Sequence, residues 1–165
     1  MRCMMDKGYV HIFCGEGKGK TTAAVGQAIR AASMGKNVFI IQFLKEKLSE
    51  EIRFIERLEP EIKLFRFQKA DCAFSNLTQE EQAEEAQNIR NGWNFAKKVM
   101  VTQECDMLIL DEVLGLIEKG IITEEEVKSL ITSRDENMSL ILTGIPCQES
   151  LWEYADMVTE LIQRR

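Results

Sequence analysis

The sequence predicts an α/β fold in which a mostly parallel central sheet carries helices on both faces. Apolar runs of strand length recur between longer helical patterns: Tyr9 to Cys14, Val38 to Phe43, Ile62 to Phe67, Met107 to Leu110 and Ser139 to Thr143. These runs lack the alternation of a half-exposed strand, because a strand covered by helices on both sides is apolar on both faces. The segments between them are long enough for crossover helices, which parallel strands require.

Capping boxes mark the beginnings of two helices. Thr78 is followed three positions later by Glu81, and Thr123 is followed by Glu126. Each threonine is therefore expected to cap a helix, and a long amphipathic pattern with an acidic first turn follows Thr78. The charge-rich segment from Leu44 to Glu61 is either a helix with solvated charges or a mobile loop beside a ligand, and the solvated surface is favoured.

Length, charge and cysteine usage limit the classes of function. The 165 residues, of which 45% are hydrophobic, fit a single domain over residues 1–165. The net charge of -6 argues against a nucleic-acid partner, which favours a basic surface. The apolar runs are too short to span a membrane, so no membrane partner is expected. The five scattered cysteines, in a chain without a signal peptide, fit a reducing cytoplasm.

The segment from Gly15 to Thr22 has the features of a phosphate-binding loop. Its glycines let backbone N–H groups converge on phosphate oxygens, and the N-terminus of the following helix adds a partial positive charge. Lys20 supplies a full positive charge, and Thr21 offers a hydroxyl to a divalent cation. The residue five positions before Gly19 is Cys14, where the usual spacing has glycine. The loop is thus a variant that predicts binding of a nucleoside triphosphate with a divalent cation.

Two acidic residues follow the apolar run that begins at Met107. Asp111 and Glu112 stand at its carboxyl end, as in a Walker B element. Because Mg²⁺ prefers oxygen ligands and takes only one or two from a protein, one of these carboxylates is expected to contact the ion directly or through water.

These residues resemble the ATP:corrinoid adenosyltransferases, a branch of the P-loop proteins. The resemblance extends from Gly8 to Glu160 and includes the shortened glycine spacing of the loop. The matching segments, in order, are Gly15 to Ala24, Arg30-Ala31, Gly35-Lys36, Gln42 to Lys45, Leu110 to Glu112, Leu142 to Gly144 and Ala155 to Glu160. The resemblance implies a three-layer P-loop NTPase fold of the RecA-like type, and a homodimer.

In that family a Co(I) corrinoid attacks the 5'-carbon of ATP, forms a cobalt–carbon bond and releases triphosphate. The resemblance therefore implies ATP and a corrinoid as substrates, Mg²⁺ or Mn²⁺ as the metal ion, and an electron donor that forms Co(I). It implies Lys20, Thr21 and Glu112 as catalytic residues, with Glu112 preferred over Asp111 as the metal carboxylate beside Thr21. The residues implied to bind the substrates are Gly15, Glu16, Gly17, Lys18, Gly19, Lys20, Thr21, Thr22, Arg30 and Phe74.

The sequence departs from the family pattern at three places. Asn76 replaces the tryptophan of a Phe-x-Trp segment that, in the family, approaches the lower face of the corrinoid. Ile145 replaces an arginine, and a basic tail after the last strand is absent. Two other functions remain open at this point. One is a P-loop ATPase or phosphotransferase, which breaks the bond to the γ-phosphate, and the other is a non-catalytic, ATP-dependent binding protein descended from the transferase.

Overall fold

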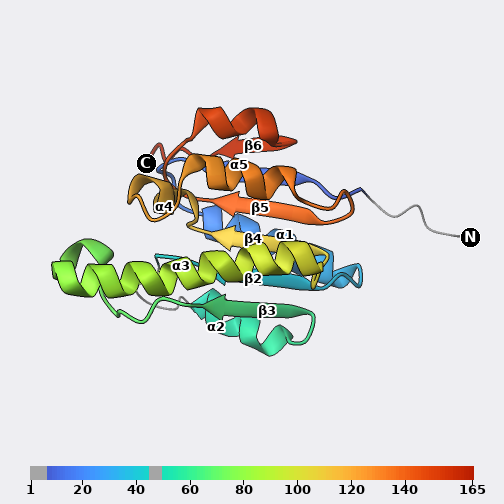
Figure 1. Ribbon diagram of the computed structural model, residues 1–165. Coiled ribbons are helices and arrows are strands. Elements are labelled where there is room, and N and C mark those ends of the chain that lie inside the picture. Colours follow the sequence, from blue (N-terminus) through green and yellow to red (C-terminus); the bar gives the residue numbers. More distant parts are fainter. Residues whose placement is uncertain (1–6, 45–49) are drawn as a thin grey trace, which may run out of the picture.

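A six-stranded sheet forms the centre of the computed structural model, which describes residues 7–44 and 50–165 (Figure 1). The strands are β1 (Val10–Cys14), β2 (Val38–Gln42), β3 (Ile62–Arg66), β4 (Met107–Asp111), β5 (Ser139–Thr143) and β6 (Met157–Glu160). Their order across the sheet is β3-β2-β4-β5-β1-β6, and every pairing is parallel. All carboxyl ends therefore lie at one edge, to which the arrowheads in Figure 1 point.

Helices cover both faces of this sheet, which gives three layers. On one face lie α1 (Lys20–Ser33) and α2 (Glu50–Ile55), and on the other lie α3 (Gln79–Thr102), α4 (Leu114–Glu118) and α5 (Glu124–Thr132) (Figure 1). Short 3₁₀ turns occur at η1 (Glu56–Leu58), η2 (Phe74–Asn76) and η3 (Glu149–Tyr154). Among the described residues, no helix has the length and apolar character needed to cross a lipid bilayer.

The core is divided into two clusters because neighbouring residues of a strand point to opposite faces. In β4, Leu108 and Leu110 pack in the cluster under α3, α4 and α5, whereas Ile109 packs with α1 and α2. All five β4 residues are buried. This two-sided burial explains why the sequence runs lack alternation, and it confirms the predicted α/β class with a parallel sheet.

The five predicted strands are all present, with ends that shift by no more than one residue. The strand β6 was not predicted, because it lies at the edge of the sheet and three of its four residues are exposed. An exposed edge strand has no continuous apolar run to mark it. In the charge-rich segment, residues 50–58 form α2 and η1, whereas 45–49 lie outside the described residues.

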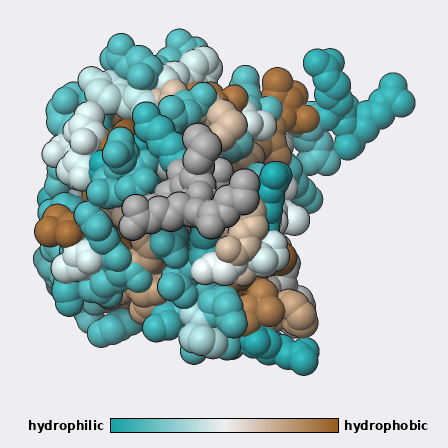
Figure 2. All heavy atoms as spheres, turned by 90° about the vertical axis from the view of Figure 1, so that its right-hand side faces the viewer, coloured by the Kyte–Doolittle hydropathy of each residue, from teal (hydrophilic) through white to brown (hydrophobic). Residues whose placement is uncertain are grey.

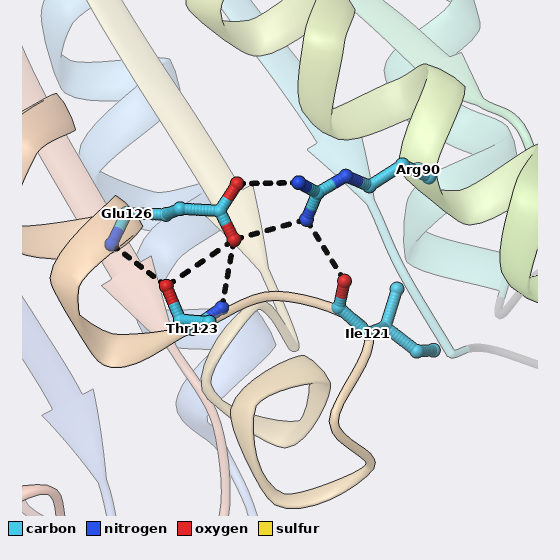
Figure 3. Close-up of polar contacts among 4 residues, drawn as sticks. All are labelled: Arg90, Ile121, Thr123 and Glu126. Carbon is cyan, nitrogen blue, oxygen red and sulfur yellow. Dashed lines mark hydrogen bonds and ion pairs between the residues drawn. The ribbon is translucent and has the colours of Figure 1, made fainter.

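Both predicted capping boxes are confirmed, and the second one takes part in a link between helices. Thr78 caps α3 and Thr123 caps α5, each with its glutamate returning a bond to the cap. The Glu126 carboxylate of the second box also accepts two bonds from the Arg90 guanidinium of α3, at 3.0 and 2.5 Å (Figure 3). Arg90 in turn donates to the carbonyl of Ile121 at 2.9 Å. A single side chain therefore ties α3 to α5.

Candidate active site

The loop between β1 and α1 has the backbone conformation that its glycines permit. Gly15 and Gly19 have φ angles of 102° and 103°, in the region that side chains with a Cβ disfavour. A Cβ on Gly17 would lie 2.5 Å from the carbonyl oxygen of Leu161. Glycine is therefore required at two positions by conformation and at the third by the close approach of the chain that follows β6.

Two amides of this loop fasten it to neighbouring segments. Gly15 N–H donates to the carbonyl of Ile145 at 3.1 Å, and Gly17 N–H donates to the carbonyl of Leu161 at 2.8 Å. Gly19 precedes α1 without a side-chain cap. The first N–H groups of this 14-residue helix therefore point toward the space above the loop, where an anion is favoured.

Lys20 places a buried ammonium group inside the loop. Its Nζ donates to the carbonyl oxygens of Gly15 at 2.6 Å and Gly17 at 2.8 Å, and the residue is 7% exposed. An ammonium group has three hydrogens, so one remains for a phosphate oxygen. The loop thus holds the charge of Lys20 in place before a phosphate arrives.

The carboxylate of Asp111 connects four elements at the carboxyl edge of the sheet. It accepts from Thr21 Oγ1 at 3.0 Å, from Gln42 Nε2 at 3.0 Å and from Thr143 Oγ1 at 2.7 Å. These donors come from α1, β2 and β5, and Asp111 itself ends β4 with 1% exposure. A buried carboxylate is costly unless it is hydrogen-bonded, and this network supplies the bonds.

Glu112 directly follows β4 and has a left-handed backbone conformation. Its φ angle is 61°, and its backbone N–H donates to Thr143 Oγ1 at 2.8 Å. The family resemblance ranks Glu112 first as the metal carboxylate, but the side chain in hydrogen-bond contact with Thr21 is that of Asp111. The geometry therefore favours Asp111 as the carboxylate beside a cation at Thr21.

Arg30 is not brought to the loop. It lies in the last turn of α1, ten residues after Lys20, which corresponds to about 15 Å along a helix axis. It lines a cavity with Tyr9, His11 and Met157, where the strands begin. Figure 2 views this edge, whose visible surface is mostly hydrophilic with scattered hydrophobic residues. Within one chain, this placement does not favour the expected contact between Arg30 and a phosphate.

The other residues implied to bind substrates lie on or near the carboxyl edge. Glu16, Lys18 and Thr22 are exposed on the loop and the first turn of α1. Phe74, in η2, is partly buried against the core, and the ammonium of Lys119 lies 5.6 Å from its ring centroid. Asn76, two residues later, is exposed.

A cavity of about 700 Å³ lies beside the loop, lined in part by Glu16, Glu118 and Ile145. The position where the family has arginine therefore faces the same space as the loop. Cys14 lies below this loop and is fully buried. Burial raises the pKa of the Cys14 thiol to about 12, so this residue is neutral at physiological pH and presents no thiolate nucleophile.

No role was predicted for Gln42 and Thr143, the residues that donate to the Asp111 carboxylate. Both are polar residues at the carboxyl ends of buried strands, and Gln42 stands directly opposite Asp111 in the sheet. In a strand covered on both faces, a buried amide or hydroxyl at this end is the signal that identifies such a residue.

Comparison with known families gives a match that spans nearly the whole chain. Residues 6–165 match the family described as ATP:corrinoid adenosyltransferase BtuR/CobO/CobP. The chain belongs to this family. Its members act on ATP and a corrinoid, so this adenosyltransferase is an enzyme of cobalamin biosynthesis.

Individual relatives agree with this assignment. The corrinoid adenosyltransferase of Escherichia coli K12 is 35% identical over 156 residues, which are 94% of this chain and 77% of the relative. The corrinoid adenosyltransferase CobA of Salmonella typhimurium has the same identity and coverage. Among solved structures, the KaiC-like protein PH0186 of Pyrococcus horikoshii matches with a TM-score of 0.59 and 18% identity, over 96% of this chain and 75% of that one. This likeness supports the RecA-like P-loop fold.

Proposed function

We propose that the chain transfers the 5'-deoxyadenosyl group of ATP to the Co(I) centre of a corrinoid, in the synthesis or salvage of adenosylcobalamin. The cobalt electron pair forms the bond to the 5'-carbon, while the carbon–oxygen bond breaks and its electron pair leaves with triphosphate. The observation that carries the proposal is the Thr21–Asp111 contact beside the buried Lys20, in a chain of this family. In the proposed reaction, these residues stabilise the negative charge that the leaving triphosphate acquires.

Lys20 and the N-terminus of α1 bind the triphosphate. The ammonium of Lys20 is held by two loop carbonyls, so its charge is in place before the leaving group acquires negative charge. Preorganised groups of this kind are worth about 3–4 kcal/mol of barrier each, because no solvent reorganisation is needed during the reaction. Lys18, exposed on the same loop, adds a second cation to the phosphate chain.

Thr21 and Asp111 hold Mg²⁺, or Mn²⁺ in its place. A hydroxyl and a carboxylate next to each other form a hard oxygen donor set, which suits these ions. The ion supplies positive charge that neutralises the phosphate oxygens. Gln42 and Thr143 orient the Asp111 carboxylate from both sides, and Glu112 lies one residue further as the second acidic group of the site.

The corrinoid is proposed to bind at the same edge, with Phe74 toward its lower face. The proposal includes an electron donor that forms Co(I), and a homodimer in the cytoplasm. Four cysteines of the described residues, namely Cys14, Cys72, Cys105 and Cys147, are free thiols, which accords with a reducing compartment.

The test is to incubate the protein with ATP, Mg²⁺ and chemically reduced cobalamin. The expected product is adenosylcobalamin, recognised by the light sensitivity of its cobalt–carbon bond. Bound ATP without any adenosylcobalamin, under conditions that maintain Co(I), would contradict the proposal and favour a non-catalytic binding protein.

A further inference from the structure

The segment between β3 and α3, residues 67–78, is fastened to α3 by a buried carboxylate. Glu85 is 4% exposed, and its Oε1 accepts the backbone N–H groups of Lys69 at 2.8 Å and Ala70 at 3.1 Å. Its Oε2 accepts from Asn88 Nδ2 at 3.1 Å. Three donors therefore satisfy one carboxylate, and two of them belong to the backbone of the segment.

A second side chain of α3 holds the other half of this segment. Gln82 Nε2 donates to the carbonyl of Phe74 at 3.2 Å and to the carbonyl of Leu77 at 3.0 Å. Gln82 and Glu85 are three residues apart, so they lie on the same side of the helix. Glu85 bonds to the chain before η2, whereas Gln82 bonds to Phe74, the first residue of η2, and to Leu77, the residue that follows it.

The chemistry of the two residues is not interchangeable. Glu85 serves only as an acceptor, because it faces backbone N–H groups, whereas Gln82 serves as a donor, because it faces two carbonyls. Burying a carboxylate costs free energy that an apolar side chain would not cost. A role in fixing the conformation of the segment explains why a charged residue stands at this buried position.

The turn η2, which is held by these bonds, borders a cavity at the carboxyl edge of the sheet. A cavity of about 520 Å³ lies between the first half of α3 and the chain after α4, and it is lined by Phe74, Gln82 and Lys119, among others. The Phe74 ring is partly buried and has the Lys119 ammonium over its face. The position of this ring therefore depends on where α3 holds the backbone of residue 74.

We propose that Glu85 and Gln82 are positioning residues for the corrinoid: they fix the segment that carries Phe74, and through it the contact of this ring with the lower face of the corrinoid. The inference rests on the proposed function. The two side chains act on backbone groups and leave the phosphate loop untouched, so their effect belongs to the corrinoid and not to ATP.

The test compares Glu85→Met, which removes the acceptor, with Glu85→Gln, whose amide oxygen still accepts from both backbone N–H groups. Glu85→Met is expected to raise the KM for the corrinoid by about tenfold, since two partly buried backbone N–H groups lose their partner. Glu85→Gln should stay within about threefold of the unchanged protein, and the Kd for Mg²⁺-ATP should change by less than about twofold in both. The neighbouring Glu84, which is exposed, provides the matched control as Glu84→Met.

Substitutions of Gln82 test the loss of a hydrogen-bond donor, whereas those of Glu85 test the loss of an acceptor. Gln82→Glu places a carboxylate against two carbonyls and should raise the corrinoid KM at least as much as Gln82→Met. If Glu85→Met does not fold, as judged by loss of ATP binding, the half-buried Gln82 variants decide the question.

A double-mutant cycle with Phe74→Ala separates an effect of Glu85 on the position of Phe74 from a general destabilisation of the segment. If Glu85 acts through Phe74, then Glu85→Met should have little further effect on the corrinoid KM once the ring is removed. The absorbance spectrum of bound Co(II) corrinoid, which reports its axial ligand, should change in parallel. Two results would overturn this inference and leave the proposed function intact. One is full additivity of the Glu85→Met and Phe74→Ala effects on the corrinoid KM, and the other is an unchanged corrinoid KM in both Glu85→Met and Gln82→Glu. An unchanged protein that forms no adenosylcorrinoid would overturn the proposed function and this inference together.

Discussion

The hydroxyl oxygen of Thr21 lies 3.0 Å from Oδ1 of Asp111, although the two residues are 90 positions apart in the sequence. Parallel pairing of β1 with β5 and of β5 with β4 brings them together, because it places the carboxyl end of β4 near the phosphate loop that follows β1. In the proposed metal site, this contact joins the residue that would offer a hydroxyl to the metal ion with the carboxylate that would balance the charge of the ion. Because Asp111 makes this contact through its side chain, substitutions of Asp111 and of the adjacent Glu112 should differ in their effect.

We predict that Asp111→Asn weakens metal binding by the enzyme more than Glu112→Gln does. The Asp111→Asn variant should need on the order of tenfold more Mg²⁺ for half-maximal activity, because the negative charge next to Thr21 is lost. Glu112→Gln is the matched control, since it removes an adjacent carboxylate. Titration of adenosylcobalamin formation with Mg²⁺ measures both. A larger shift in Glu112→Gln would restore Glu112 as the principal metal carboxylate.

Lys20→Ala is expected to lower kcat/KM by at least about 100-fold, because a preorganised charge next to the leaving triphosphate is removed. Lys20 also holds the loop through Gly15 and Gly17, so ATP binding should weaken as well. Steady-state rates together with ATP titration measure both effects. Activity within a few-fold of the unchanged protein would show that the triphosphate does not use this ammonium group.

Arg30→Ala is predicted to leave the Kd for ATP within about twofold, because the helix carries Arg30 about 15 Å from Lys20. Equilibrium titration with a fluorescent ATP analogue measures this Kd. A loss of ATP affinity comparable to that of Lys20→Ala would show that Arg30 reaches the nucleotide after all.

The link between α3 and α5 makes a prediction about stability. Glu126→Gln should lower the free energy of unfolding by about 1 kcal/mol at pH 7, since the bidentate bond to Arg90 and the cap of Thr123 are both weakened. Glu81→Gln is the matched control, because its capping box has no such arginine bond in the described structure. The control should lose less stability. Urea unfolding of the three proteins measures the difference.

The bonds between Arg90 and Glu126 also predict how the stability of the protein depends on pH. Hydrogen bonds from Arg90 are the main reason that the pKa of Glu126 lies below its usual value of 4.5. A carboxyl group whose pKa is lowered in the folded state stabilises the protein at pH values above its usual pKa. This contribution is lost as the pH falls through the pKa of the folded state. The stability difference between the unchanged protein and Glu126→Gln should therefore be constant near pH 7 and shrink below about pH 4.5. A difference that grew on acidification would contradict this account.

The fold was predictable because buried parallel strands must be apolar on both faces. This constraint marked β1 to β5 in the sequence, and the reciprocal bonds of capping boxes marked Thr78 and Thr123. The edge strand β6 was not predicted, since a mostly exposed strand does not have to be apolar on both faces. Local rules therefore predict the elements that are buried or capped, and they miss those that only complete an edge.

The site was predictable only in part. The loop from Gly15 to Thr22 is local in sequence, so its place between a strand and a helix could be inferred. The choice between Asp111 and Glu112 depends on how the chain turns at residue 112, where φ is 61°. Arg30 was assigned by its match to the family, but the helical rise carries it away from the loop. Such assignments need tertiary structure, because they depend on direction as well as on spacing.

The phosphate product of the reaction shows which bond of ATP the protein breaks. Phosphorus NMR of a reaction with ATP, Mg²⁺ and Co(I) cobalamin should show inorganic triphosphate, one molecule for each adenosylcobalamin formed. Formation of ADP and phosphate in place of triphosphate would mean that the loop directs cleavage at the γ-phosphate, and it would contradict adenosyl transfer by this chain.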